Sequence, residues 1–142
     1  MRRWLLVVIA SWVVVTAPIS AAGTVVVTTL NVGGGVTRYA VAWTSTAGGA
    51  VSANLFDVKA GLLLAVKVVP SAATAPTALY DVTLVDTDSV DLLNGQAADQ
   101  SATVGKYFVF NPPLIVDSTQ QLDVVVANAG NAKLGTVYLW VR

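Results

Sequence analysis

Acidic side chains are concentrated in one stretch of the sequence, LYDVTLVDTDSVDLLNG at residues 79–95, which holds four of the eight aspartates. Within it, Asp86, Asp88 and Asp91 are close enough to share one loop and, with backbone carbonyl oxygens, to bind Ca²⁺. An EF-hand loop needs glycine at its sixth position and a closing glutamate, but Asp91 stands at that position and the chain has no glutamate. We therefore expect a turn, in which these side chains accept hydrogen bonds from nearby backbone N–H groups, and keep Ca²⁺ binding as the weaker alternative.

The other residue types needed for common enzyme chemistry are missing or poorly placed. Histidine and cysteine are absent, which removes the commonest general base, the commonest metal ligand and any thiolate nucleophile. A glycosidase would need two carboxylates in a buried, aromatic-lined cleft, whereas these aspartates lie among small polar residues. No serine lies in a G-x-S-x-G sequence, and VGGGV at 32–36 lacks the spacing of a phosphate-binding loop and predicts a flexible turn. We expect no enzyme, no catalytic residue, no cofactor and no small-molecule substrate.

Two more aspartates, Asp81 and Asp123, lie inside otherwise apolar segments. We expect both at solvent-facing positions of a sheet that has one wet face. The alternative is an ion pair with Lys67 or Lys106 of another subunit.

Four aromatic residues, Tyr39, Trp43, Tyr138 and Trp140, lie on segments in which side chains alternate between two faces. They could form a platform on which sugar rings stack, but such residues are more often anchors of a core or of a protein interface. We expect a core or interface role and not a sugar platform. We treat these four residues, with the final Arg142, as candidate interface residues.

The composition indicates an all-β protein. Residues are 55% hydrophobic and only 11% charged, valine is the commonest type, and residues that suit helix surfaces are scarce. Alternating segments between Gly, Pro and Asn turns predict a single antiparallel β-sandwich or jelly-roll-like barrel of eight or nine strands over residues 23–142. The last strand is expected at an edge, where it could pair with another chain. The expected strands are 24–32, 36–44, 50–58, 61–70, 78–86, 106–110, 114–117, 121–129 and 134–142.

Residues 1–22 have the layout of a secretory signal. Two arginines precede an apolar run over residues 4–15, and small residues lead up to Ala22. The run is shorter than the roughly 20 residues that span a bilayer. Taken by itself, this segment predicts export with cleavage after Ala22; the alternatives are an N-terminal strand or arm, or a start assigned too far upstream.

Three segments of the sequence resemble a family of small bacteriophage proteins. The family has the order W-T-S-D-x-x-G-x-V, then L-Y-D-V-T-L-x-D-x-D-G-x-D-x-L-x-G, then L-x-V-x-x-x-G-N-A-K-x-G-T-V. This chain departs from it at Ser89, which replaces a glycine, and at Thr46, which replaces an aspartate. The matching segments are WTSTAGGAVSANLFDVKAG (43–61), PTALYDVTLVDTDSVDLLNGQAADQSAT (76–103) and LDVVVANAGNAKLGTVYLWVR (122–142).

The resemblance implies a small virion component, a head decoration or fibre-base protein. Its partners would be copies of itself, with a trimer favoured, and capsid or other virion proteins. Phage heads assemble in the cytoplasm, so a virion protein would keep residues 1–22 as an apolar arm. The alternative class is an exported β-sandwich, periplasmic or surface-bound, that binds a ligand or polysaccharide. The formal net charge is zero and no basic stripe is present, so we expect no nucleic-acid partner.

Overall fold

A computed structural model describes residues 23–52, 54–117 and 119–142, and the structural statements below concern those residues. The predicted secretory segment, residues 1–22, lies outside them. No helix in the described part has the length and hydrophobicity needed to cross a membrane. The described strands are β1 (Thr24–Gly33), β2 (Val36–Thr44), β3 (Phe56–Asp57), β4 (Gly61–Pro70), β5 (Asp81–Val85), β6 (Lys106–Val116), β7 (Gln121–Ala127) and β8 (Leu134–Val141).

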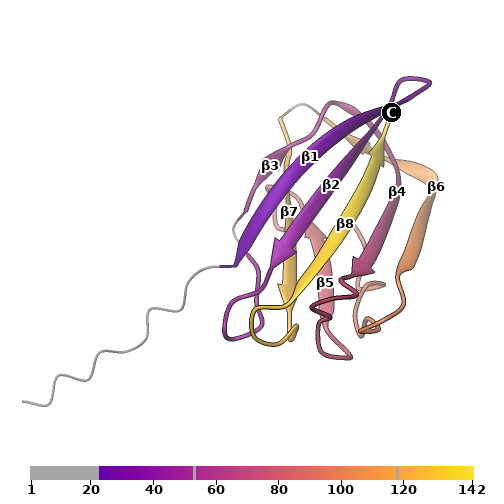
Figure 1. The fold of residues 1–142 in the computed structure, drawn as a ribbon. Coiled ribbons are helices and arrows are strands. Elements are labelled where there is room, and N and C mark those ends of the chain that lie inside the picture. The colour runs from indigo at the N-terminus through magenta and orange to yellow at the C-terminus, as the bar shows by residue number, and fades with distance from the viewer. Residues whose placement is uncertain (1–22, 53, 118) are drawn as a thin grey trace, which may run out of the picture.

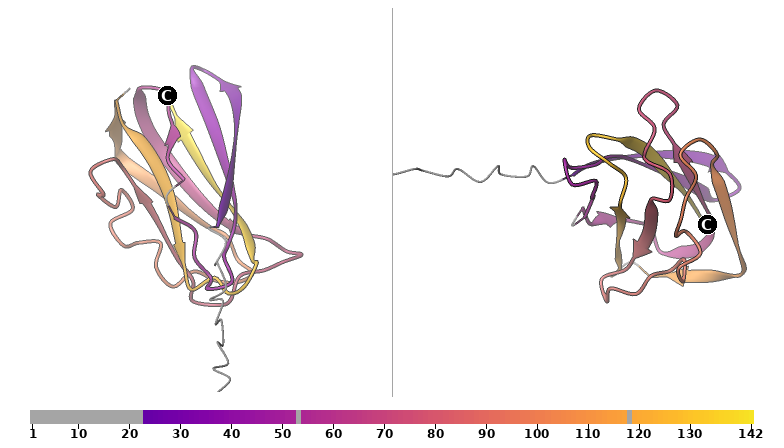
Figure 2. Two further views of the ribbon diagram at one scale, coloured as in Figure 1. Left: turned by 90° about the vertical axis from the view of Figure 1, so that its left-hand side faces the viewer. Right: turned by 90° about the horizontal axis from the view of Figure 1, so that it is seen from below.

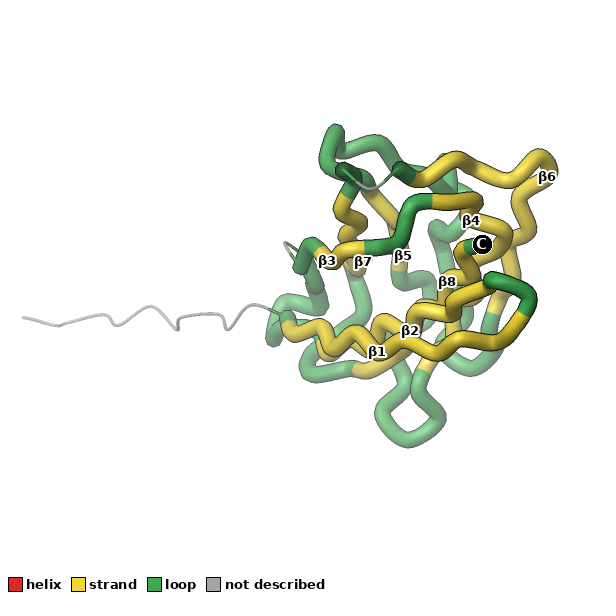
Figure 3. Tube along the Cα trace, turned by 90° about the horizontal axis from the view of Figure 1, so that it is seen from above, coloured by secondary structure: helices red, strands yellow, loops and turns green. Residues whose placement is uncertain are grey.

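The strands form two antiparallel sheets that pack as two layers (Figure 1; Figure 2). The larger sheet has the strand order β1-β2-β8-β4-β6, and the smaller one has the order β3-β7-β5. Seen from above, the two sheets face each other across the interior (Figure 3). The predicted all-β fold is confirmed, and it takes the form of a sandwich of eight strands rather than a closed barrel.

Alternation of side chains along the strands builds the core. On β2, Tyr39, Val41 and Trp43 point inward and are buried, as every second residue of a strand must do when one face is covered. On β8, four alternate positions that include Leu139 are buried in the same way. The ring of Trp43 lies 6.0 Å from that of Tyr80, centre to centre, so this pair joins the two layers.

The first two strands are joined by the predicted glycine turn. Gly33, Gly34 and Gly35 all have positive φ angles, which residues with a side chain rarely adopt. A tight hairpin at this point requires such angles, so the turn interpretation of VGGGV is confirmed.

Two predicted strand boundaries are wrong. Among the described residues of the segment 50–58, only Phe56–Asp57 form a strand, and Val51 forms an isolated bridge to Val126. Residues 106–110 and 114–117, expected as separate strands, form the single strand β6, with a cis bond between Asn111 and Pro112. Proline is tolerated there because β6 lies at a sheet edge, and its pairing with β4 shifts register across this point.

The predicted edge position of the last strand is also wrong. β8 lies in the middle of the larger sheet, between β2 and β4, and its backbone is paired on both sides. The edges are β1 and β6. Nothing in the local pattern of residues 134–142 distinguishes a central from an edge strand, because both bury alternate side chains.

Candidate functional site

The acidic stretch forms a turn whose centre is Asp86. This buried carboxylate accepts hydrogen bonds at Oδ1 from the backbone N–H groups of Asp88, at 3.0 Å, and Val90, at 2.9 Å. The backbone N–H of Ser89 donates to the Asp86 carbonyl at 3.0 Å. Ser89 has a φ of 63°, so it occupies the conformation that glycine would adopt most easily at this point.

Asp91 organises the next turn in a similar way. Its Oδ1 accepts from the backbone N–H groups of Leu93, at 3.0 Å, and Leu84, at 3.3 Å, and its Oδ2 accepts from Gly95 at 2.8 Å. Asp88, the third calcium candidate, is exposed. Within the described residues no three acidic side chains converge on a point where they could hold a metal ion. These contacts support the turn interpretation over the Ca²⁺ alternative.

Asp81 and Asp123 differ from each other. Asp81 is half-buried and accepts hydrogen bonds from the Asp99 backbone N–H at 3.0 Å and from the Asn128 side-chain amide at 2.9 Å. Asp123 is buried, at 5% exposure, and accepts from the Asn54 backbone N–H at 3.2 Å. The predicted solvent-facing position is therefore wrong for Asp123, because a neighbouring segment covers that end of the smaller sheet.

The four aromatic candidates separate into two pairs. Tyr39 and Trp43 lie in the core, so their prediction as interface residues is wrong and the core alternative holds. Tyr138 and Trp140 lie on the opposite, outer face of the larger sheet and are half-buried. Arg142 follows β8 and is exposed; its backbone N–H donates to the Leu62 carbonyl at 2.9 Å.

Strand order adds a third aromatic residue to the outer pair. The ring of Trp140 lies 5.4 Å from that of Tyr107 on β6 and 6.1 Å from that of Tyr138, with tilted planes in both cases. Tyr107, Tyr138 and Trp140 together are named the aromatic shelf below. Sequence reasoning missed Tyr107, because β6 and β8 are brought close together only by the strand order, in which both pair with β4.

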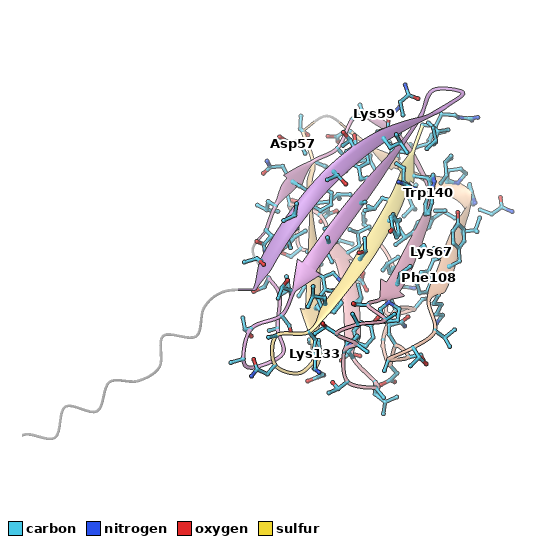
Figure 4. The ribbon with its side chains drawn as sticks, viewed as in Figure 1. Asp57, Lys59, Lys67, Phe108, Lys133 and Trp140 are labelled. Atoms are coloured by element: carbon cyan, nitrogen blue, oxygen red, sulfur yellow. The ribbon has the colours of Figure 1, made fainter. Side chains whose placement is uncertain are left out.

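Two cations lie beside the aromatic shelf. Arg38 on β2 pairs in register with Trp140, and its guanidinium carbon lies 5.2 Å from the centre of the Tyr138 ring. Lys67 on β4 pairs in register with Tyr138 and is exposed (Figure 4). With Val69, these four residues line a shallow hollow of about 270 Å³ over β8, named the β8 hollow below.

Charge is divided between the two sheets. In the strands of the larger sheet every charged residue is a cation, and in those of the smaller sheet every charged residue is an aspartate. No carboxylate therefore stands at any strand position around the β8 hollow. The cations are Arg38, Lys67 and Lys106, and the aspartates are Asp57, Asp81 and Asp123.

The edge strand β1 is a second candidate site. Among the described strands it pairs with β2 alone, and it stands at the end of its sheet. Its sequence, TVVVTTLNVG, contains neither a charge nor a proline, the features that usually protect an edge from pairing with another chain. Val26 is 62% exposed and Leu30 is 50% exposed.

Comparison with known proteins finds no matching family model, curated protein or solved structure. The two candidate sites, the β1 edge and the β8 hollow, therefore carry the functional argument. Of the four ring or cation members of the hollow, sequence reasoning named Tyr138 and Trp140, considered Lys67 only as an ion-pair partner of Asp81 or Asp123, and missed Arg38. Their spacing along the chain gives no signal, because three different strands bring them together.

Proposed function

We propose that this chain is a non-enzymatic structural protein of a bacteriophage particle, an accessory component of the decoration type that acts by packing against copies of itself and other particle proteins. The resemblance of three sequence segments to small phage proteins supplies the kind of particle. The observation that carries the assembly role is the open edge of β1.

Strand addition at β1 is physically favourable. About half of the N–H and C=O groups of an edge strand point away from its single neighbour, and a strand from another chain can pair with them. The exposed side chains of Val26 and Leu30 would add apolar contact to those hydrogen bonds. β1 spans ten residues, which is long for an edge strand with no charge or proline.

The hydrogen bonds that the acidic side chains accept support a role without catalysis. Asp86 and Asp91 accept backbone hydrogen bonds within their own turns, and Asp81 is held by Asp99 and Asn128. These carboxylates stabilise loops, and none of them lies beside the β8 hollow. A structural role needs such fixed loops, whereas acid–base chemistry needs a carboxylate that faces a substrate.

The two edges of the larger sheet favour a two-fold contact over the trimer implied by the resemblance. The β6 edge contains Pro112 and Pro113, which lack the backbone N–H that a new ladder would need. β1 therefore finds a better partner in another β1 than in β6. Antiparallel pairing of two β1 strands is a self-complementary contact, which gives a dimer.

The assembly role is tested by sedimentation velocity on the full chain and on the double variant Val26→Lys and Leu30→Lys. Two lysines on one edge disfavour strand addition through repulsion and desolvation, so we expect self-association to weaken at least about tenfold. Both side chains are exposed, so the fold should be retained. The matched control, Val104→Lys with Ile115→Lys, adds the same charge at exposed apolar positions near the other edge and should associate like the parent.

A monomeric parent chain, or equal weakening in both variants, would contradict assembly through β1. The particle itself is tested separately, by mass spectrometry of density-purified phage from cultures that produce this chain. We expect the protein in the particle fraction with residues 1–22 retained. Its recovery only outside particles, with those residues removed, would favour the exported alternative.

A further inference from the structure

We propose that the β8 hollow is a binding site for an anionic saccharide, a sugar that carries carboxylate or sulfate groups. This inference goes beyond the assembly role and does not depend on β1, because pairing at a sheet edge leaves the outer face of the sheet open. The site is built by Arg38, Lys67, Val69, Tyr138 and Trp140.

The aromatic shelf provides the surface for the sugar ring. Trp140 is tilted by 45° against Tyr107 and by 37° against Tyr138, so the three rings form a stepped surface and not a slot between parallel planes. A flat aromatic ligand would need parallel planes to be held on both sides, whereas a puckered sugar ring can lie on one exposed ring face. The hollow is shallow and open, which suits one part of a longer chain better than a fully enclosed small molecule.

The two cations provide the preference for negative charge. Arg38 and Lys67 lie on β2 and β4, on opposite sides of β8, and pair with Trp140 and Tyr138, which are two residues apart along β8. Two strand spacings of about 4.8 Å and two residues at about 3.3 Å each put their backbones about 12 Å apart. The Nε atom of Arg38 is buried and finds no hydrogen-bond partner among the described residues. Lys67 is exposed, with no described residue paired to its ammonium group. The buried Nε cannot itself reach a ligand, but the terminal Nη groups of Arg38 are not buried in this way and have no hydrogen-bond partner among the described residues. These Nη groups and the Lys67 ammonium group are therefore the donors available to acidic oxygens.

The charge pattern of the whole molecule distinguishes this site from other cationic positions. Lys106, the third cation of the larger sheet, already donates to the Gln96 carbonyl at 2.9 Å. Arg38 and Lys67 have no carboxylate at the strand positions around them, so an incoming anion meets no competing internal partner. A charge-assisted hydrogen bond at each end of the hollow would orient the ligand across β8.

Single-stranded nucleic acid shares the stacking and anion chemistry, but the observations favour the sugar. Binding of a nucleic-acid backbone takes a groove in which cations follow successive phosphates. Here two cations face one hollow, and the described residues together carry six cations against eight aspartates. Beyond Arg38 and Lys67 the strands of the larger sheet carry only Lys106 as a further cation, and it already donates to the Gln96 carbonyl, so no row of cations continues along successive phosphates.

The test is isothermal titration calorimetry of the full chain with galacturonate tetrasaccharide, and with maltotetraose as the neutral sugar of the same length. We expect the acidic sugar to bind at least about tenfold more tightly, and its affinity to fall with added salt. Lys67→Gln and Arg38→Gln should each weaken it about tenfold, and Trp140→Ala at least fivefold. Lys133→Gln removes one cation from a loop at the far end of β8 and should leave binding unchanged (Figure 4).

Each of the following results would overturn the proposal. Equal binding of the neutral sugar would remove the role of the cations. Equal binding of tripolyphosphate, unaffected by Trp140→Ala, would indicate ion exchange without a sugar site. Absence of binding by either sugar, or tighter binding of a short single-stranded oligonucleotide, would reject the ligand class. Lys67 is exposed, so Lys67→Gln folds and keeps the test decisive even if Trp140→Ala is unstable. Loss of self-association in Lys67→Gln without sugar binding would assign the hollow to a contact between copies, and would leave the β1 variants to test assembly independently.

Discussion

Two buried tyrosines show how the same residue type can have opposite effects on stability. The Tyr39 hydroxyl accepts a hydrogen bond from the Lys59 backbone N–H at 2.8 Å. The Tyr80 hydroxyl is buried and finds no partner among the described residues. Burial raises the pKa of Tyr80 from its ordinary value of 10.0 to about 12, because the interior disfavours the charged phenolate.

We expect Tyr80→Phe to stabilise the fold by about 1 kcal/mol, because it removes an unsatisfied polar group, and Tyr39→Phe to destabilise it by about 1–2 kcal/mol, because it leaves a backbone N–H without its acceptor. The pKa of Tyr80 is higher in the folded than in the unfolded state, so the free energy of unfolding does not depend on this group below pH 10. Between pH 10 and pH 12 the unfolded tyrosine ionises first, and the free energy of unfolding falls by roughly 2–3 kcal/mol in the parent and in Tyr39→Phe but not in Tyr80→Phe. Urea denaturation from pH 8 to pH 12 measures the free energy of unfolding of the parent and of both variants. A lower stability of Tyr80→Phe than of Tyr39→Phe at pH 8 would contradict the roles given to the two hydroxyl groups.

At the scale of the elements, the sequence is informative about individual strands and much less about their order. Alternation places the buried and outer residues of β2 and β8 correctly, because one covered face imposes a two-residue period. It could not reveal that β8 lies between β2 and β4, since sheet order depends on long-range pairing. That one fact moves the open edge to β1 and creates the β8 hollow from Arg38, Lys67 and the outer aromatic residues.

The pairing of β2 with β8 depends on a glycine opposite a tryptophan. Gly135 pairs with Trp43, and a Cβ atom on Gly135 would lie 2.3 Å from Cζ2 of the indole ring. Because Trp43 is packed in the core against Tyr80, it cannot move away without disturbing both sheets.

We therefore expect Gly135→Ala to destabilise the protein by about 2–3 kcal/mol, as overpacked core substitutions do. The control is Gly48→Ala, where the added Cβ would meet only the Thr46 hydroxyl at an ordinary 3.7 Å and stability should change by less than about 0.5 kcal/mol. Thermal unfolding followed by circular dichroism compares them. Equal melting temperatures for the two variants would show that Trp43 does not pack closely on Gly135.

At the scale of the whole molecule, the sandwich has one cationic and one acidic sheet. The charged residues in the strands of the larger sheet are Arg38, Lys67 and Lys106, whereas those in the strands of the smaller sheet are all aspartates. The formal net charge of zero hides this division, because opposite charges cancel in the total without being mixed in space. The absence of histidine and cysteine, by contrast, can be read directly from the sequence, and it favours a function carried by a surface or a sheet edge.

The proposed assembly role depends on β1 strands pairing between copies of the chain. Hydrogen–deuterium exchange of the full chain at low and high protein concentration tests this most directly, with β6, the other edge of the same sheet, as the internal control. If β1 strands pair between copies, the amides of Thr24–Gly33 should gain protection as concentration rises, while those of Lys106–Val116 should not. Exchange in Thr24–Gly33 that does not depend on concentration, or protection gained in β6 instead, would contradict the assembly role proposed for this protein.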